Sequence, residues 1–165
     1  MLKLFFCIVV LAVISAAQAV PANLLNHDVS QKTLATTVCI SGYTKAVRPS
    51  TTYTNSIKKR FMREKGMDYD GEKGNYELDH IIPLALGGHP RNLSNLMLQH
   101  WDGHDGAKRK DRLEVKLQCL VCSGDVPLAV AQDAIWTDWQ AAYSTYGRMV
   151  CHRPRGLRSG DYGDE

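Results

Sequence analysis

The chain has 165 residues, and its apolar and charged fractions of 44% and 22% are those of an ordinary soluble globular protein of one domain. It contains no internal repeat, which excludes a repeat architecture. A formal net charge of +3 is only mildly basic, so any affinity for a polyanion must come from local clusters of charge.

Residues 1–19 have the features of a cleaved signal peptide. Lys3 supplies the positive start, the run from Leu4 to Ile14 is apolar, and Ala17-Gln18-Ala19 is an A-x-A cleavage site. The apolar run is shorter than the roughly 20 residues that span a bilayer, although an uncleaved anchor is the alternative. We therefore expect a mature chain that begins near Val20, is secreted or periplasmic, and has no membrane segment.

The cysteines are consistent with export. Cys7 is lost with the signal peptide, which leaves an even set in an oxidising compartment: Cys39, Cys119, Cys122 and Cys151. We expect two disulfides, and the sequence does not choose among the three pairings. The alternative is a four-thiolate zinc site, because Cys119 and Cys122 have ligand spacing, but Cys39 and Cys151 do not form a second such pair.

The N-terminal half of the mature chain predicts one strand and one helix. Residues 20–34 show no clear period and are interpreted as a loose segment. Thr36–Tyr43 is rich in β-branched and aromatic residues, which favours a short strand. Apolar residues at helical spacing over residues 53–62 predict a helix, which Ser50 or one of the next two threonines can cap and Gly66 ends.

The C-terminal half predicts two more helices. The first can be capped by Asp105 and stops at Ser123-Gly124, with an apolar face inward and a basic face outward. The second has Pro127 in its first turn and an apolar stripe along one side. The domain is expected to span residues 20–151, and residues 152–165 are predicted to be a disordered tail.

The stretch from Tyr76 to Leu98 predicts the centre of the fold. Its two apolar runs, Tyr76–Pro83 and Leu93–Leu98, each favour a strand, and a glycine-containing loop separates them. With the helix that follows, the order is strand, loop, strand, helix. We therefore predict an α+β fold in which additional helices and the disulfides brace this core.

Asp79 and His80, side by side in the first predicted strand, are residue types that phosphodiester hydrolysis needs. A neutral histidine, with an ordinary pKa of about 6.5, can take a proton from water, and a carboxylate can hold a divalent cation. Adjacent strand residues point to opposite faces. The two can serve one site only if the strand ends or twists there, which Pro83 favours.

With these residues in place, the chain resembles the HNH endonuclease family. The matching elements are Asp79-His80-Ile81-Ile82-Pro83, Gly87-Gly88, Asn95-Leu96 with Leu98, and His104. The resemblance extends from about Val38 to Tyr143 and is to exported bacterial proteins of that family. Many family members carry paired CxxC zinc knuckles around the motif, and this sequence does not.

The resemblance implies a ββα-metal core and a role for each matching residue. His80 would be the general base, and Asp79 would bind the metal. Asn95 would tie the loop together by hydrogen bonds to the backbone, and His104 would be the second metal ligand, with His100 as the alternative. The expected cofactor is a divalent ion, with Mg²⁺ favoured over Mn²⁺ or Zn²⁺.

The resemblance also favours one disulfide pairing, Cys39 with Cys122 and Cys119 with Cys151. Three cations on the predicted helix are expected to contact nucleic acid: Lys108, Lys110 and Arg112. For Lys110 and Arg112, salt bridges with Asp111 or Glu114 are the alternative.

The expected function is that of an exported, monomeric, metal-dependent endonuclease with low sequence specificity, acting on nucleic acid with DNA favoured. A toxin or effector with the same catalysis would have an inhibitor or immunity protein as a partner. The alternative from another class is an exported domain that keeps the fold and binds DNA or another polyanion without cutting it.

Overall fold

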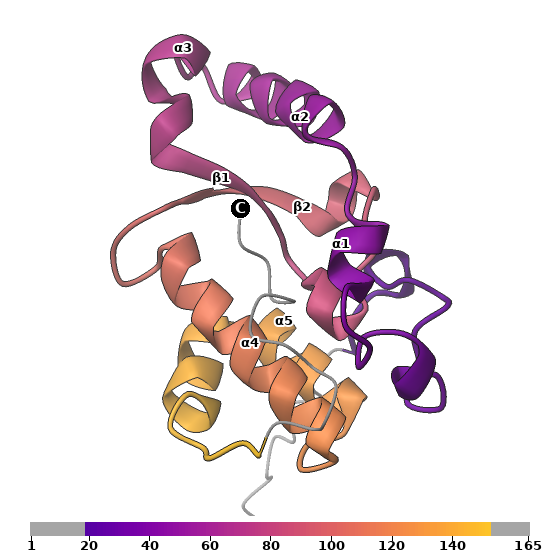
Figure 1. Cartoon of the computed structure of the whole chain (residues 1–165). Helices are drawn as coiled ribbons and strands as arrows, with labels where there is room; N and C mark the ends of the chain where they lie inside the picture. Colours follow the sequence, from indigo (N-terminus) through magenta and orange to yellow (C-terminus); the bar gives the residue numbers. More distant parts are fainter. Residues whose placement is uncertain (1–18, 153–165) are drawn as a thin grey trace, which may run out of the picture.

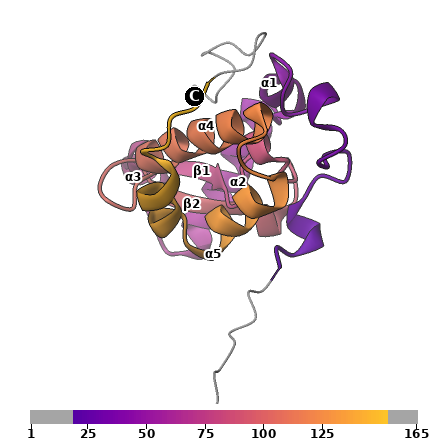
Figure 2. The same ribbon diagram turned by 90° about the horizontal axis from the view of Figure 1, so that it is seen from below.

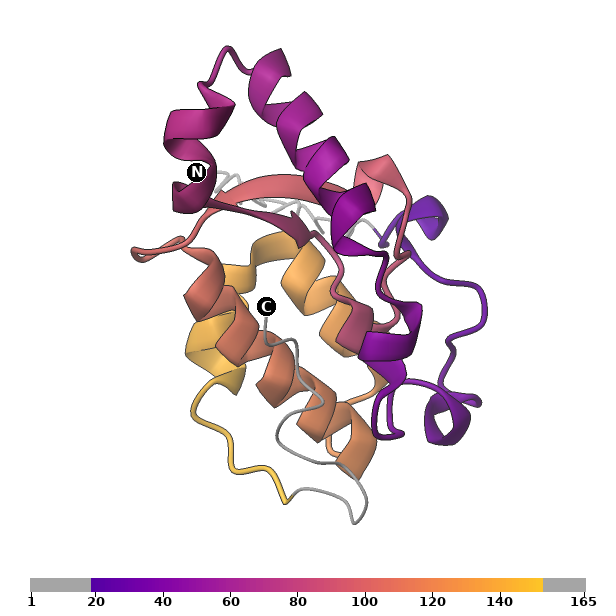
Figure 3. The same ribbon diagram turned by 45° about the horizontal axis from the view of Figure 1, so that its top comes forward.

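The computed structural model describes residues 19–152, so the predicted signal peptide and tail lie almost wholly outside the described part. Within it the fold is α+β, with a two-stranded hairpin between two groups of helices (Figure 1). Helices α2 and α3 lie on one side of the strands, and α4 and α5 lie on the other (Figure 3). The coarse prediction of an α+β fold is confirmed.

The hairpin consists of β1 (Tyr76–His80) and β2 (Leu96–His100), which pair antiparallel over their full length. His80 is opposite Leu96 in this register. Both strands were predicted, but the second begins three residues later than its apolar run, because Leu93–Asn95 form a 3₁₀ turn. The backbone N–H of Ile81 donates to the carbonyl of Asn95 at 2.9 Å, so contact between the two arms continues just beyond the strand end.

Helix α2 (Thr51–Glu64) packs on the outer face of the hairpin. The side chain of Ser50 accepts a hydrogen bond from the Tyr53 backbone, which confirms the predicted cap. Ile57 on its inner side is buried with Leu78 of β1 and Leu96 of β2. The short helix α3 (Tyr69–Glu72) then leads into β1.

The main core lies between α4 (Ala107–Ser123), α5 (Leu128–Tyr146) and the loop after β1; Figure 2 shows these two helices in front of the strands. The residue that caps α4 is Gly106, not the predicted Asp105. A Cβ on Gly106 would lie 2.6 Å from the backbone of Asp102, so only glycine fits there. Gly124 ends α4 in the left-handed conformation, as predicted.

The strand predicted over Thr36–Tyr43 is wrong. The chain there forms a 3₁₀ turn at Leu34–Thr36 and then helix α1 (Tyr43–Val47). A strand needs a neighbour for its backbone groups. Here the fully buried Val38 has its carbonyl bonded at 2.7 Å by the side chain of Gln118 from α4, so a helix side chain satisfies this backbone group.

Two disulfides fasten the segments before α1 and after α5 to α4, and the favoured pairing is confirmed. Cys39–Cys122 holds the N-terminal segment, and Cys119–Cys151 holds the segment after α5. No helix within residues 19–152 is long and apolar enough to cross a membrane. The two disulfides are compatible with an extracellular or periplasmic protein.

Candidate functional site

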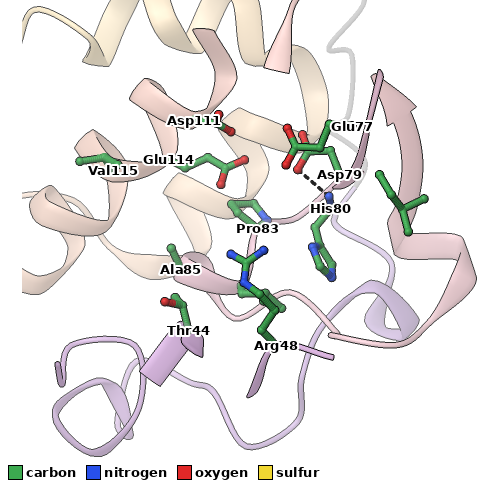
Figure 4. A pocket seen from close by; sticks show the side chains of 12 residues that line it. Thr44, Arg48, Glu77, Asp79, His80, Pro83, Ala85, Asp111, Glu114 and Val115 are labelled. Atoms are coloured by element: carbon green, nitrogen blue, oxygen red, sulfur yellow. Dashed lines mark hydrogen bonds between the residues drawn. The ribbon is translucent and has the colours of Figure 1, made fainter. Parts of the chain in front are cut away.

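A pocket lies at the end of β1, where this strand meets the end of α1 and one face of α4 (Figure 4). Its charged and titratable lining consists of Arg48, Glu77, Asp79, His80, Asp111 and Glu114. Asp79 and His80, which were expected to serve one site, both line this pocket. The hairpin and α4 therefore bring the central sequence motif to a single concave place on the molecule.

The adjacent side chains can share the pocket because β1 ends at His80. Asp79 turns toward Glu77, whereas the imidazole of His80 turns the other way, toward Arg48 (Figure 4). Oδ1 of Asp79 accepts the backbone N–H of His80 at 2.6 Å, which fixes the two residues relative to one another. Side chains from both faces of the end of β1 therefore line the pocket.

The imidazole of His80 is held in one tautomer. Its Nε2 lies 3.2 Å from the carbonyl oxygen of Pro90, and a carbonyl can only accept, so Nε2 carries the hydrogen and Nδ1 keeps its lone pair. Burial lowers the pKa of His80 below its ordinary value of 6.5. The charges of Lys110 and Arg48 act in the same direction, and the Pro90 hydrogen bond and Asp79 oppose them. At neutral pH the ring is therefore an uncharged proton acceptor.

Asn95 closes the loop that follows β1. Its side chain is fully buried, its Oδ1 accepts the N–H of Ile82 at 2.8 Å, and its Nδ2 donates to the carbonyls of Ile82 at 3.0 Å and His89 at 3.1 Å. Gly88 is needed beside it, because a Cβ there would lie 1.7 Å from the Ile82 carbonyl oxygen. Asn95 thus makes the hydrogen bonds to the loop backbone that the resemblance led us to expect.

Lys110 does not face solvent, and its expected contact with phosphate requires correction. The side chain is 1% exposed, and its Nζ donates to Oδ2 of Asp79 at 2.8 Å, to the carbonyl of His80 at 2.7 Å, and to Glu114. The alternative, a salt bridge with Glu114, is what the structure shows. The four-residue spacing of Lys110 and Glu114 on a helix was the sequence signal for it.

The charges around Lys110 set the protonation of the cluster formed by Lys110, Asp79 and Glu114. Burial alone would lower the pKa of Lys110, but the charges of Asp79 and Glu114 outweigh burial and raise it, so the amine stays protonated. Burial raises the pKa of Glu114 to about 7, against the opposing effect of the Lys110 charge. The ammonium group is thus a permanent positive charge beneath the pocket.

The structure does not bring the expected histidine ligands to Asp79. The side chain of His104 is 71% exposed, and its Nδ1 lies 2.8 Å from Oδ1 of Asp105. His100 is also exposed, with its Nδ1 against the backbone of Asp102. Neither histidine lines the pocket, and among residues 19–152 no three His, Cys, Asp or Glu side chains are grouped to hold a metal ion.

Of the two expected ligands, Asp79 has the chemistry that a hard divalent cation prefers, since Mg²⁺ favours carboxylate oxygen. Both of its oxygens already have protein partners, the His80 N–H at Oδ1 and the Lys110 ammonium at Oδ2. The pair of Asp79 and His104 therefore does not fit a metal ion in this arrangement.

Two of the three cations expected to contact nucleic acid lie on the outer surface of α4. Lys108 is exposed and forms a salt bridge of 2.7 Å with Asp102. Arg112 is exposed, with its Nε 3.5 Å from the hydroxyl of Tyr143. Neither side chain lines the pocket.

The pocket also contains a residue that sequence reasoning missed. Arg48 lies at the end of α1, and Figure 4 shows its guanidinium group beside the ring of His80. No pattern in the sequence singled out Arg48 as a candidate site residue. No local signal could reveal its place, because packing of α1 against the loop after β1 brings it to His80.

The pocket residues together offer a neutral base, a cation and a cluster of carboxylates within one pocket.

The chain matches no family model, no curated protein and no solved structure. Its function is therefore inferred from the chemistry of the pocket.

Proposed function

We propose that this protein is an exported, metal-dependent endonuclease of the HNH type that hydrolyses phosphodiester bonds in nucleic acid, with His80 as the general base. One observation carries the proposal: the Nε2–H of His80 is bonded to the Pro90 carbonyl, which leaves Nδ1 as a basic nitrogen in a pocket. The lowered pKa of the ring keeps that nitrogen unprotonated at neutral pH. A general base needs this combination of position and protonation state.

In the proposed reaction, His80 takes one proton from a water molecule as the water oxygen attacks phosphorus. The new P–O bond replaces the bond to the leaving nucleotide oxygen, which takes a proton from solvent water, and the proton on His80 returns to solvent. Asn95 keeps the loop that carries Pro90 in place through its bond to His89. Lys110 donates hydrogen bonds to both the Asp79 carboxylate and the carbonyl of His80, and these bonds fix the backbone that carries the proposed base.

A divalent cation, Mg²⁺ first, remains part of the proposal. The expectation of this ion comes from the resemblance alone, because within residues 19–152 the expected ligand His104 lies away from Asp79 on the surface. We propose low sequence specificity, because contacts to phosphate carry no information about the base sequence.

The test is nicking of supercoiled plasmid by the purified protein with Mg²⁺ or Mn²⁺, and with EDTA. His80→Ala should abolish nicking while the circular dichroism spectrum and melting temperature stay near those of the wild type. His100→Ala, which removes an exposed histidine, is the matched control and should leave nicking unchanged. A folded His80→Ala protein that nicks at the wild-type rate would refute the proposal.

Two further results of this assay carry information. A wild-type protein that shifts the plasmid on a gel without nicking it, with either metal, would support the non-catalytic binding domain instead. His104→Ala tests the expected metal ligand: a ligand role requires that the variant need a higher Mg²⁺ concentration for half-maximal nicking. From the exposed position of His104, we expect no such change.

A further inference from the structure

The pocket has two electrostatically different sides. Carboxylates from β1 and α4 line one side: Glu77, Asp79, Asp111 and Glu114. Figure 4 shows Arg48 on the other side, with the ring of His80 beside it. Among the described residues that line the pocket, Arg48 is the one lysine or arginine.

This polarity restricts how an anionic substrate can lie. A phosphodiester carries one negative charge, and the carboxylates would repel it from their side of the pocket. A guanidinium group attracts it and offers a planar fork of N–H donors that matches two phosphate oxygens. The phosphate should therefore lie at the Arg48 side, where it is also next to the proposed base.

The backbone around Arg48 is well fixed. Its N–H donates to the carbonyl of Thr44 at 3.0 Å and closes the last turn of α1. The next residue, Pro49, is buried and restricts the backbone on the other side. Helix α1 packs against the 3₁₀ turn Leu84–Leu86, which directly follows the pocket residue Pro83. The guanidinium group of Arg48 thus projects from the end of α1, a helix that packs close to the end of β1.

We propose that Arg48 binds the substrate phosphate beside His80, so that the pocket takes a phosphodiester anion at its Arg48 side. This inference rests on the proposed nuclease function and assigns the phosphate contact to the end of α1. The cations of α4, which the sequence suggested for this contact, lie outside the pocket or beneath it.

Plasmid nicking kinetics test the assignment. Arg48→Ala should lower kcat/KM by about 100-fold, which is typical for removal of one donor to a reacting group. Arg48→Lys keeps the charge but loses the fork, so its activity should lie between the two. Lys45→Ala removes a positive charge from the exposed part of the same helix and should stay within about threefold of the wild type.

A second readout is independent of catalysis. In the His80→Ala background with EDTA, binding of a short DNA duplex is measured by fluorescence anisotropy over a range of salt concentrations. Loss of Arg48 should weaken binding and reduce the slope of log K against log salt by about one, as expected for one phosphate contact. Loss of Lys45 should leave that slope unchanged.

The outcomes separate the two proposals. If Arg48→Ala nicks and binds like the wild type while His80→Ala is inactive, this inference is overturned and the nuclease function stands. If His80→Ala is fully active, the nuclease mechanism itself fails. If Arg48→Ala does not fold, the comparison passes to Arg48→Lys and Arg48→Gln. Higher activity of the lysine variant then supports the phosphate contact, and equal activity overturns it.

Discussion

The Nζ atom of Lys110 lies 2.8 Å from Oδ2 of Asp79, and the two side chains are only 1% and 7% exposed. A buried ion pair of this kind costs desolvation energy, and it persists because the ammonium also bonds to the His80 carbonyl and to Glu114. These bonds join α4 to the end of β1. The position of the proposed base is therefore coupled to α4, the helix that follows the hairpin in the sequence.

Replacement of Lys110 by methionine should destabilise the protein strongly. The change keeps most of the side-chain volume but leaves the Asp79 carboxylate buried without its cation, which typically costs about 3–5 kcal/mol. Urea unfolding measures the loss. Lys108→Met, two residues earlier in α4 and exposed, is the control and should change the free energy of unfolding by less than about 1 kcal/mol. Equal effects of the two variants would contradict the structural role of Lys110.

The activity should persist into mildly acidic solution. Because burial lowers the pKa of His80 below 6.5, the neutral form of the ring predominates at pH 6.5. We expect the acid limb of kcat/KM for nicking to have its midpoint below pH 6.5. A midpoint at or above that value would argue against His80 as the titrating base.

The same shift has a consequence for stability. Below pH 6.5 the unfolded chain binds a proton at His80 before the folded chain does, so this residue contributes a loss of stability as pH falls toward the folded pKa. Urea unfolding of the wild type and of His80→Ala between pH 7 and pH 5 measures this contribution. The variant should lose less stability over that interval, and identical pH profiles would contradict the prediction.

Asn95→Asp should be more damaging than its small size change suggests. The Oδ1 contact to the Ile82 N–H can survive, but a carboxylate oxygen would face the carbonyls of Ile82 and His89, where Nδ2 donates now. We expect a loss of about 3 kcal/mol at pH 8 and a loss of nicking. Stability should recover partly as pH falls and the carboxyl group is protonated. Asn55→Asp, on the exposed face of α2, is the control and should be nearly neutral.

The two disulfides should contribute unequally. Their sequence separations are 83 residues for Cys39–Cys122 and 32 for Cys119–Cys151. The chain-entropy relation gives the longer loop an advantage of about 0.8 kcal/mol, within a typical total of about 2–5 kcal/mol for each bond. Thermal and urea unfolding of the two paired cysteine-to-alanine variants measure the difference. A larger loss from the shorter loop would contradict the entropic account.

Local sequence patterns were sufficient for most of the secondary structure. Helix α2 follows from apolar spacing with Ser50 as its cap, and the end of α4 follows from Gly124. These signals succeed because the residues that act are neighbours in the chain. The prediction for Thr36–Tyr43 failed for the opposite reason. Its β-branched composition favours a strand, but no strand within residues 19–152 pairs with it, and the side chain of Gln118 bonds to the carbonyl of Val38 instead.

The sequence by itself determined that Asp79 and His80 are neighbours in a predicted strand, that a helix follows the hairpin, and that an even number of cysteines remains after residue 19. Only the tertiary structure decided that Lys110 turns inward to Asp79 and that Arg48 reaches His80. The physical reason is burial. Whether a lysine or an arginine meets solvent, a carboxylate or a substrate depends on which distant element covers it, and side-chain type and spacing do not contain that information.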